Sequence, residues 1–368
     1  MYIKTAYSTK GTSDDVIQDL KSQLGEFDTK MLVFFASSRL APNIIGKKVQ
    51  DAFPGAAVFG CSTAGEIVSG KMLKNSLVAM AFNSGAVRDV KVEVVENPKN
   101  DNSVKKAFAT CEDHFKAPMS GLDPAAYVGM IFVDGLSGAE EKLIDKIGDL
   151  TNVNFIGGSA GDDLKFEETH VYANGKSYTN AAVLAVLKPG VPFTFIKTQS
   201  FCDLGKKLIV TKANEEKREV IEFNDKPAAQ AYAEVLGVAV EEAPNRFMHN
   251  PVGLVIDGVP FVRSPQRIKG ESMLFYCGVT EGMELSLLES TNIIDDTRQA
   301  VAQAAEELGS ISGIININCI LRTLELDQKE LTDDYGKLFS DYPTVGFSSY
   351  GEQFIGHINQ TATMLVFK

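Results

Sequence analysis

The sequence predicts an α/β protein with mixed β-sheets, flanking helices and two tandem domains. Short apolar stretches typical of buried strands alternate with segments of helical periodicity. One order of elements (strand, helix, strand, serine–glycine loop, hairpin) occurs three times along the chain, which indicates an internal repeat. The length of 368 residues suits two or three domains, each with its own core.

The composition excludes several classes of protein. The formal net charge of −12 disfavours nucleic acid and anionic membranes as partners. No apolar run approaches the roughly 18 residues of a membrane-spanning helix, and the N-terminus lacks the apolar core of a signal peptide. The five cysteines are dispersed and show no CxxC spacing, as expected of reduced thiols in the cytoplasm.

The first copy of the repeat begins with a buried strand, a helix and a second buried strand, at 31–36, 41–53 and 56–60. Two β-rich segments, 76–82 and 87–96, follow the loop. The tetrapeptide NSGA between these segments predicts a hairpin. A helix at 103–115 then leads to the second copy.

The second copy has its strand, helix and strand at 127–135, 137–150 and 153–157. The helix is expected to start at a serine, followed by an acidic first turn. The turn signal ANGK predicts a hairpin between strands near 168–173 and 180–187.

The third copy has its elements at 312–320, 324–339 and 344–347, and QFIGHI and TATMLVF are expected to form a closing hairpin. The intervening region contains further strands and two helices, at 227–237 and 291–309, the second capped by Thr or Asn. A charged segment near 215–228 indicates the domain boundary. The expected domains are residues 1–220 and 221–368.

The loops of the three copies share a glycine, a serine, a second glycine and a carboxylate. These are Gly60, Ser62, Gly65 and Glu66, then Gly157, Ser159, Gly161 and Asp162, then Gly346, Ser348, Gly351 and Glu352. Each loop leaves the C-terminal end of a strand, where ligands bind in parallel sheets. Glycines let backbone N–H groups approach a ligand, Arg322 or Arg39 suits a carboxylate, and Glu66 or Glu352 suits an amine. The pattern therefore favours a small zwitterion such as an amino acid.

Other interpretations of these residues remain open. Gly-Ser-Gly segments between strands are often plain tight turns. GGSAG at 157–161 matches the nucleophile elbow, which would make Ser159 the nucleophile of a hydrolase, but no amphipathic helix follows. Cys61 is an alternative nucleophile without a histidine nearby in sequence, so a buried thiol is favoured. The four histidines show no metal-ligand spacing.

Several separated motifs resemble the FIST domains, named after F-box and intracellular signal transduction proteins. FGCSTAGEI resembles the FIST N-terminal domain, whereas FVRSPQRIKGESMLFYCG, NCILR and VGFSSYGEQFIGHINQTATML resemble, in order, the FIST C-terminal domain. The matching positions are Gly60, Cys61, Ser62, Gly65, Glu66, Arg263, Cys319, Arg322, Gly346, Tyr350, Gly351, Glu352, Asn359 and Gln360.

The resemblance implies a non-enzymatic sensory module that binds a small molecule, with amino acids as proposed ligands, and that works with a signalling protein such as a histidine kinase. The expected ligand-binding residues are Gly60, Cys61, Ser62, Gly65, Glu66, Ser159, Gly161, Asp162, Arg263, Cys319, Arg322, Ser348, Tyr350, Gly351 and Glu352. No cofactor is expected. Because some family members resemble haem-binding sensors of nitric oxide, His357 is the alternative haem ligand; by strand alternation it should share a face with Ile355 and Asn359.

Overall fold

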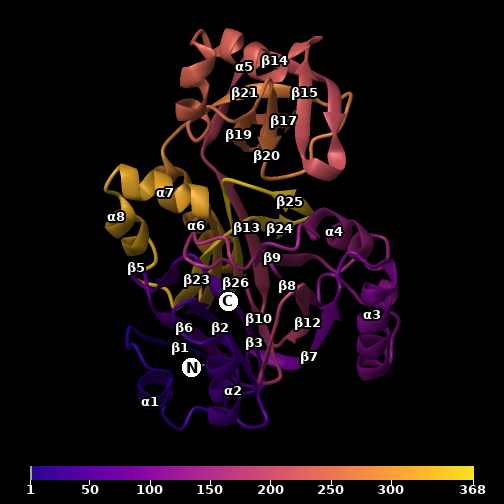
Figure 1. Ribbon diagram of the computed structural model, residues 1–368. Coiled ribbons are helices and arrows are strands. Elements are labelled where there is room, and N and C mark those ends of the chain that lie inside the picture. Colours follow the sequence, from indigo (N-terminus) through magenta and orange to yellow (C-terminus); the bar gives the residue numbers. More distant parts are fainter. Residues whose placement is uncertain (1) are drawn as a thin grey trace. The chain divides into compact units, whose positions relative to one another are not determined.

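The chain forms two compact units that do not follow each other simply in sequence. A computed structural model describes residues 2–368 (Figure 1). Unit 1 comprises the residues up to Lys197 together with Thr297–His357 and Ala362–Lys368, and unit 2 comprises Thr198–Asp296 and Ile358–Thr361. The mixture of helices and mixed sheets confirms the predicted α/β class. The predicted domains, residues 1–220 and 221–368, refer to the FIST-like N-terminal and C-terminal parts of the sequence and not to these compact units. The boundary between them stays a prediction.

Unit 1 contains three sheets of six strands, described in order from one edge to the other. Sheet 1 is β1 (Ile3–Ser8), β6 (Leu77–Phe82), β2 (Met31–Ser37), β3 (Ala57–Thr63), β10 (Val171–Ala173) and β11 (Lys176–Tyr178). Sheet 2 is β7 (Val87–Glu96), β12 (Ala181–Pro189), β8 (Val128–Val133), β9 (Phe155–Ser159), β24 (Glu352–Phe354) and β25 (Gly356–Ile358). Sheet 3 is β13 (Phe193–Gln199), β26 (Thr361–Phe367), β22 (Gly313–Cys319), β23 (Thr344–Ser349), β4 (Glu66–Val68) and β5 (Lys71–Leu73).

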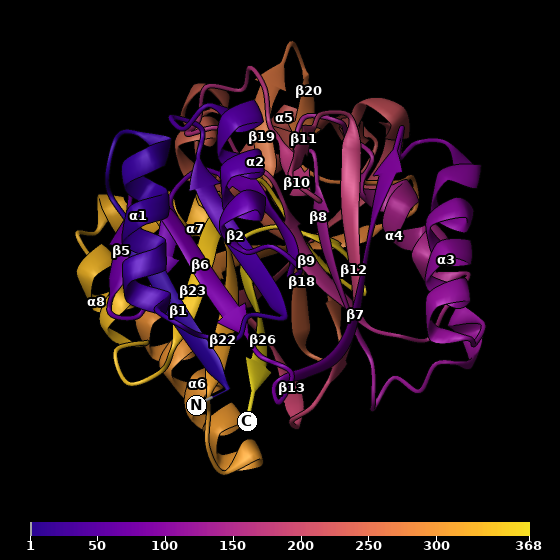
Figure 2. The same ribbon diagram turned by 90° about the horizontal axis from the view of Figure 1, so that it is seen from below.

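The three sheets have the same order of strands, which confirms the repeat. In each sheet the third and fourth strands form a parallel pair: β2 with β3, β8 with β9, and β22 with β23. Helices pack on the outer faces, as Figure 2 shows for α1 and α2 on sheet 1 and for α3 and α4 on sheet 2. The unit 1 helices are α1 (Ser13–Leu24), α2 (Pro42–Ala52), α3 (Asp101–Phe115), η1 (Met119–Gly121), α4 (Glu140–Gly148), α7 (Ile320–Gln328) and α8 (Thr332–Lys337), and α6 (Ile293–Leu308) begins in unit 2 and ends in unit 1.

Each repeat donates its hairpin to the sheet of another repeat. The β4–β5 hairpin of repeat 1 joins sheet 3, the β10–β11 hairpin of repeat 2 joins sheet 1, and the β24–β25 hairpin of repeat 3 joins sheet 2. Each chain segment then returns to its own sheet through β6, β12 or β26. The exchange ties the three sheets together in a closed cycle.

The exchange corrects three hairpins expected from the sequence. NSGA does not close a hairpin, because β6 lies in sheet 1 whereas β7 begins sheet 2. The ANGK turn joins β10 to the short β11, and the 181–189 segment is β12 of sheet 2. QFIGHI pairs within itself as β24 and β25, whereas TATMLVF returns to sheet 3 as β26. In each case a strand was assigned to the wrong partner.

The inner faces of the three sheets meet in one apolar core. One aromatic ring from each sheet lies at its centre: the Phe35 and Phe347 ring centroids are 4.6 Å apart, and Phe132 lies 5.4 Å from Phe35 and 6.0 Å from Phe347. All three side chains are fully buried. Burial of such aromatic side chains is the main source of stability for this arrangement.

Three local expectations also differ from the structure. Helix α4 begins at Glu140 behind Ala139, without the expected serine cap, although its acidic first turn is present. The predicted helix at 324–339 is two helices, α7 and α8, with a break where Glu330 has a positive φ of 57°. Ile355 lies in a turn with φ 64° and is 80% exposed, so it does not share a face with the buried His357.

Unit 2 is built on one antiparallel sheet and enters the chain between β13 and α6 of repeat 3. The Asp257–Gly258 turn between β17 and β18 is confirmed, and so is the asparagine cap of α6, where Asn292 accepts from Ile294 N–H at 3.0 Å. The elements are β14 (Phe201–Asn214), η2 (Glu215–Lys217), β15 (Glu219–Phe223), β16 (Lys226–Pro227), α5 (Ala228–Leu236), η3 (Val240–Arg246), β17 (Val252–Ile256), β18 (Val259–Arg263), β19 (Pro265–Lys269), β20 (Ser272–Phe275) and β21 (Glu284–Ser290).

Candidate functional site

The three serine–glycine loops meet in unit 1 and hydrogen-bond to one another through their backbones. The first loop contacts the second where the N–H of Gly161 donates to the carbonyl oxygen of Ser62 at 2.9 Å. The first loop contacts the third where the N–H of Ser348 donates to the carbonyl oxygen of Gly65 at 2.8 Å. The exchanged hairpins follow these loops in the chain, which explains why the loops converge.

The second and third loops are joined in the same way. The N–H of Ser159 donates to the carbonyl oxygen of Gly351 at 2.8 Å, and the N–H of Tyr350 donates to the carbonyl oxygen of Ser159 at 3.0 Å. We call residues 60–66, 157–162 and 346–352 the loop cluster. The three loops thus lie at one location, where many of their backbone groups bind one another in the described conformation.

The first glycine of each loop is required by close packing against the neighbouring strand. A Cβ added to Gly60 would lie 1.7 Å from the carbonyl oxygen of Phe34. The corresponding distances to a neighbouring carbonyl oxygen are 1.6 Å for Gly157 and 1.9 Å for Gly346. Real Cβ atoms cannot approach so closely, so these glycines have a structural role that needs no ligand.

All three loop carboxylates are buried, and two of them are held by equivalent hydroxyls. Glu66 accepts from Thr63 Oγ1, from Ser76 N–H at 3.0 Å and from Ser76 Oγ at 2.6 Å. Glu352 accepts from Ser349 Oγ at 2.5 Å, and Ser349 occupies the position of Thr63. Burial raises the pKa of Glu66 to about 7, against the opposing effect of its hydrogen bonds. Glu66 therefore titrates near neutral pH.

The carboxylate of the second loop, Asp162, has different partners. It accepts from the Tyr350 hydroxyl at 2.5 Å and from the N–H groups of Phe166, Glu167 and Glu168 at 2.9, 2.7 and 3.1 Å. Burial disfavours its ionised form, but the hydrogen bonds from Tyr350 and the three N–H groups hold the pKa of Asp162 below its ordinary value. Asp162 is thus an ionised anchor for the segment that follows it.

That segment has an uncommon backbone. Asp163, Leu164 and Phe166 have positive φ values of 56°, 65° and 55°, which bulky side chains rarely adopt. The segment is held at its start by the Asp163 carboxylate, which accepts from Ser37 Oγ at 3.0 Å and from Ser38 Oγ at 2.6 Å. Backbone strain of this kind persists only where surrounding contacts fix it.

Repeat 3 contains a buried polar network behind its loop. The side chain of Asn318 accepts from Arg322 Nε at 3.0 Å and from the Tyr335 hydroxyl at 3.1 Å, and donates to Thr323 Oγ1 at 3.0 Å. Thr323 in turn lies 2.7 Å from the hydroxyl of Ser348 in the loop cluster. All five side chains are at most 4% exposed, and Arg322 is the largest fully buried side chain among the described residues.

Asn316 extends this network along β22. Its Nδ2 donates to Tyr335 at 3.2 Å, whereas its Oδ1 is buried and has no hydrogen-bond partner among the described residues. The registers of the parallel pairs place Phe34 and Ile131 at the position of Asn316 in the other two sheets. Likewise, Ala36 and Val133 occupy the position of Asn318. The same fold is thus built twice with apolar residues where repeat 3 has asparagines, so the polar network is not a requirement of the fold.

The remaining expected site residues lie in different surroundings. Cys61 and Cys319 are buried, and burial raises the pKa of the Cys61 thiol well above its ordinary value. Arg263 belongs to unit 2, where its Nη1 donates to the carbonyl oxygen of Val262 at 3.2 Å. The buried Cys61 thiol does not suit a nucleophile.

Among the described residues, the hydroxyl of Ser159 hydrogen-bonds to Glu140 and Gln353 rather than to a histidine. Its hydroxyl lies 3.2 Å from Glu140 Oε1 and accepts from Gln353 Nε2 at 3.0 Å. His357 contacts Gln353, with 3.3 Å between Nδ1 and Nε2. His357 is buried, with 6% of its surface exposed, and haem ligation by this residue stays a prediction.

The described side chains contain no group of three or more His, Cys, Asp or Glu residues arranged to hold a metal ion. No helix in residues 2–368 is both long enough and apolar enough to cross a membrane.

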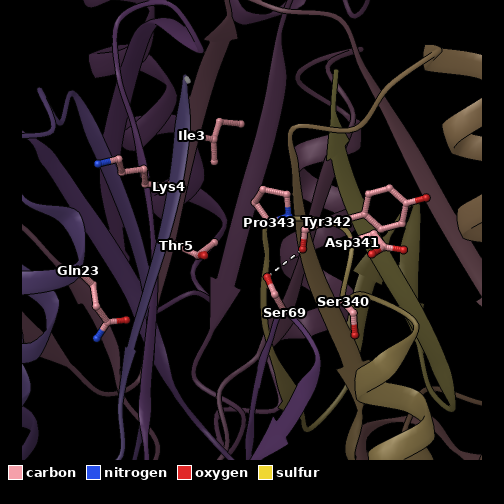
Figure 3. Close-up of a pocket in the computed structure, with 9 residues that line it drawn as sticks. All are labelled: Ile3, Lys4, Thr5, Gln23, Ser69, Ser340, Asp341, Tyr342 and Pro343. Carbon is pink, nitrogen blue, oxygen red and sulfur yellow. Dashed lines mark hydrogen bonds between the residues drawn. The ribbon is translucent and has the colours of Figure 1, made fainter.

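A cavity of about 450 Å³ lies elsewhere in unit 1, between the edge strand β1 and the segment that precedes β23 (Figure 3). Thr5 and Ser69 face each other across it, and Ser69 Oγ donates to the carbonyl oxygen of Tyr342 at 2.8 Å. The cavity is lined by Ile3, Lys4, Thr5, Gln23, Ser69, Ser340, Asp341, Tyr342 and Pro343. None of these residues belongs to the loop cluster.

Two family models match the chain in tandem and together cover most of it. The FIST N domain matches residues 30–226, and the FIST C domain matches residues 228–355. The chain belongs to the FIST family. FIST domains are sensory, ligand-binding domains of signalling proteins, so the match favours a non-enzymatic role.

One curated relative of the FIST chain is the uncharacterized protein MJ1623 of Methanocaldococcus jannaschii. It is 23% identical over 268 residues, which cover 66% of this chain and 51% of the relative. The chain therefore spans about half the length of the relative it matches, and the relative's name adds no activity or ligand.

Sequence reasoning missed several members of the site, among them Asn316, Asn318, Tyr335 and Gln353. The two asparagines stand at alternate positions of a buried strand, where the sister strands are apolar. Aligning the three strands by their loop glycines would have exposed this difference. Gln353 carried no comparable signal in the FIST sequence, because its contacts depend on the exchanged hairpin.

Proposed function

We propose that this FIST protein is a non-enzymatic sensor that binds a small polar molecule at the loop cluster and the adjoining network of repeat 3. The main support for this proposal is the polar network of Asn316, Asn318 and Arg322. The other two repeats have apolar residues at the positions of the two asparagines. A buried arginine is costly unless its charge is paired or hydrogen-bonded. Its position at the C-terminal ends of parallel strands is where such sheets bind ligands.

The chemistry of the site favours an amino acid as ligand. A guanidinium such as that of Arg322 pairs with a carboxylate in a bidentate manner. The carboxylates of Glu66 and Glu352 suit an ammonium group, and the proposed contacts include the backbone N–H groups around Ser62, Ser159 and Ser348. Cys61, Arg263, Cys319 and the loop glycines complete the proposed set.

Binding in this proposal is coupled to a change of conformation. The loops hydrogen-bond to one another, so a ligand must replace loop–loop contacts such as that between Gly161 and Ser62. A ligand that binds the opened arrangement more tightly shifts the population toward it. We propose that the change is read by a signalling partner such as a histidine kinase in the cytoplasm; dispersed, free thiols support that compartment.

A thermal-shift screen of the twenty amino acids tests the function. A ligand at 100 times its dissociation constant adds about 2.7 kcal/mol to stability, which raises Tm by several degrees. The shift should be lost in Asn318→Ala, which removes the shared partner of Arg322 and Tyr335, and kept in the control Asn102→Ala, at an exposed helix position.

Two results would contradict the proposal. No shift with any amino acid at 10 mM would exclude this ligand class. A shift that persists unchanged in a folded Asn318→Ala protein would place the ligand elsewhere.

A further inference from the structure

The first strand of unit 1 has an open edge. Strand β1 pairs only with β6, so its other side has no neighbouring strand among the described residues. The N–H of Asn83 donates to the carbonyl oxygen of Tyr2, which places the even-numbered residues of β1 in hydrogen bonds with β6. In an antiparallel strand, the N–H and C=O of the alternate residues then point to the open side. These residues are Ile3, Thr5 and Tyr7.

The last of these residues, Tyr7, already has hydrogen-bond partners in place of a neighbouring strand. The side-chain amide of Gln23 accepts from Tyr7 N–H at 3.1 Å and donates to Tyr7 C=O at 2.7 Å. One amide thus forms both hydrogen bonds that a residue of an added strand would form. No such partner is found in residues 2–368 for the outward backbone groups of Ile3 and Thr5.

The cavity of about 450 Å³ adjoins these two positions, because Ile3, Thr5 and Gln23 all line it (Figure 3). Its opposite wall is the extended segment 340–343 with Ser69. The space is therefore next to an unpaired strand edge.

The charged residues that line the cavity indicate which side chains a bound molecule should have. The ammonium group of Lys4 is turned away from the cavity, since it donates to the Leu24 carbonyl oxygen at 3.1 Å and lies 5.5 Å from the Phe27 ring centroid. Asp341 is exposed on the opposite wall. A cationic side chain of the occupant would complement it.

We propose that the β1 edge is a docking site for an extended peptide segment of a partner protein that carries a lysine or arginine opposite Asp341. The peptide adds as a strand beside Ile3 and Thr5 and ends at the position held by Gln23. Main-chain hydrogen bonds then give affinity, and the charge of Asp341 gives selectivity. This surface is separate from the loop cluster, so peptide binding here does not depend on the proposed ligand site.

The test uses two blocked peptides, acetyl-Thr-Val-Lys-Val-Thr-amide and acetyl-Thr-Val-Glu-Val-Thr-amide, with the whole protein. We expect saturable binding of the lysine peptide by calorimetry and at least tenfold slower hydrogen exchange at the Thr5 amide. The glutamate peptide should bind at least tenfold more weakly, and Asp341→Lys should reverse that preference.

Matched variants of the edge separate strand addition from other binding. Thr5→Pro removes the outward N–H, which an edge strand tolerates, and should abolish binding, whereas Thr5→Val keeps the N–H and should preserve it. Gln23→Ala, which leaves the Thr5 N–H intact and frees the groups of Tyr7, should strengthen binding of a peptide two residues longer by about threefold or more.

Three outcomes would overturn the proposal. The first is no binding of the lysine peptide at millimolar concentration. The second is equal binding by Thr5→Val and a folded Thr5→Pro protein. The third is a concentration-dependent dimer, lost in Thr5→Pro and unaffected by either peptide, which would assign the edge to a second copy of the chain.

Discussion

The hydroxyl of Tyr350 lies 2.5 Å from Oδ1 of Asp162, although the two residues are 188 positions apart in sequence and belong to different repeats. The same hydroxyl accepts from the N–H of Leu164 at 2.9 Å. A single phenol thus connects the third loop to the strained segment that follows the second loop. The Tyr350–Asp162 hydrogen bond therefore joins two repeats through side chains, in addition to the backbone pairing of the exchanged hairpins.

Removing the Tyr350 hydroxyl should loosen that segment. Tyr350→Phe removes one of the hydrogen bonds to the Asp162 carboxylate and leaves the Leu164 N–H without its hydroxyl partner, which should lower the free energy of unfolding by about 1–3 kcal/mol. Urea denaturation measures the loss, and hydrogen exchange should increase in residues 162–168. Tyr127→Phe is the matched control; a Tyr350→Phe protein as stable as this control would show that the contact is not formed in solution.

The carboxyl of Glu66 should make stability decrease as pH rises from 4.5 to about 7. Burial raises its folded-state pKa to about 7 from an ordinary value of 4.5, so in this range the folded state binds more protons than the unfolded state. The decrease is on the order of 3 kcal/mol. Glu66→Gln should remove this dependence, as measured by urea unfolding across that range.

The control for this experiment is Glu26→Gln, at an exposed position. Its pH dependence should match that of the unaltered protein. Parallel pH profiles for Glu66→Gln and the unaltered protein would mean that Glu66 does not titrate in the buried position described.

Asp162 should act in the opposite direction, at lower pH. Its folded-state pKa lies below the ordinary value, because hydrogen bonds from Tyr350 and three backbone N–H groups outweigh burial. Its contribution to stability is therefore present above pH ~4 and is lost as the pH falls through the folded-state pKa. Asp162→Asn should be less stable at pH 7 but should lose less stability between pH 5 and 3. An acid transition identical to that of the unaltered protein would contradict this role.

The first loop glycines should not tolerate alanine. Gly157→Ala would place Cβ 1.6 Å from the carbonyl oxygen of Ile131, which forces the strands apart and should cost more than about 3 kcal/mol. Gly148→Ala is the control, because no atom lies within 4 Å of its added Cβ and it ends helix α4. The control should be neutral or stabilised by up to about 1 kcal/mol in thermal unfolding. Equal effects would show that β8 and β9 are not packed as described.

Thiol labelling should distinguish buried cysteines from a reactive nucleophile. Cys202 is exposed, whereas Cys61, Cys111, Cys277 and Cys319 are buried. Burial raises the pKa of Cys111 to about 12, with smaller contributions from neighbouring charges, and likewise raises that of Cys61. Iodoacetamide should label one thiol in the native protein, lost in Cys202→Ser, and all five after denaturation. Rapid native labelling of Cys61 would revive a catalytic role.

The candidate site was predicted from sequence in its repeated parts but not in its distinctive part. Gly60, Ser62 and Glu66 were recognised because their spacing recurs in the other two loops. Arg322 was recognised as a candidate, but its partners Asn318 and Tyr335 were not, because their roles depend on packing between a strand and two helices. A single strand such as β22 does not reveal which of its faces meets a polar side chain from another element.

The sequence by itself determined the α/β class, the three copies of the repeat, the parallel strand pairs, and the turns at ANGK and Asp257–Gly258. Those features depend on the conformational preferences of individual residues and on the spacing of apolar residues, which can be recognised within each segment. Only the tertiary structure decided which sheet each hairpin joins, and hence that Ser62, Ser159 and Ser348 lie in one cluster. The physical reason is that strands pair through backbone N–H and C=O groups that are alike at every residue, so the partner of an edge is chosen by the packing of the whole core.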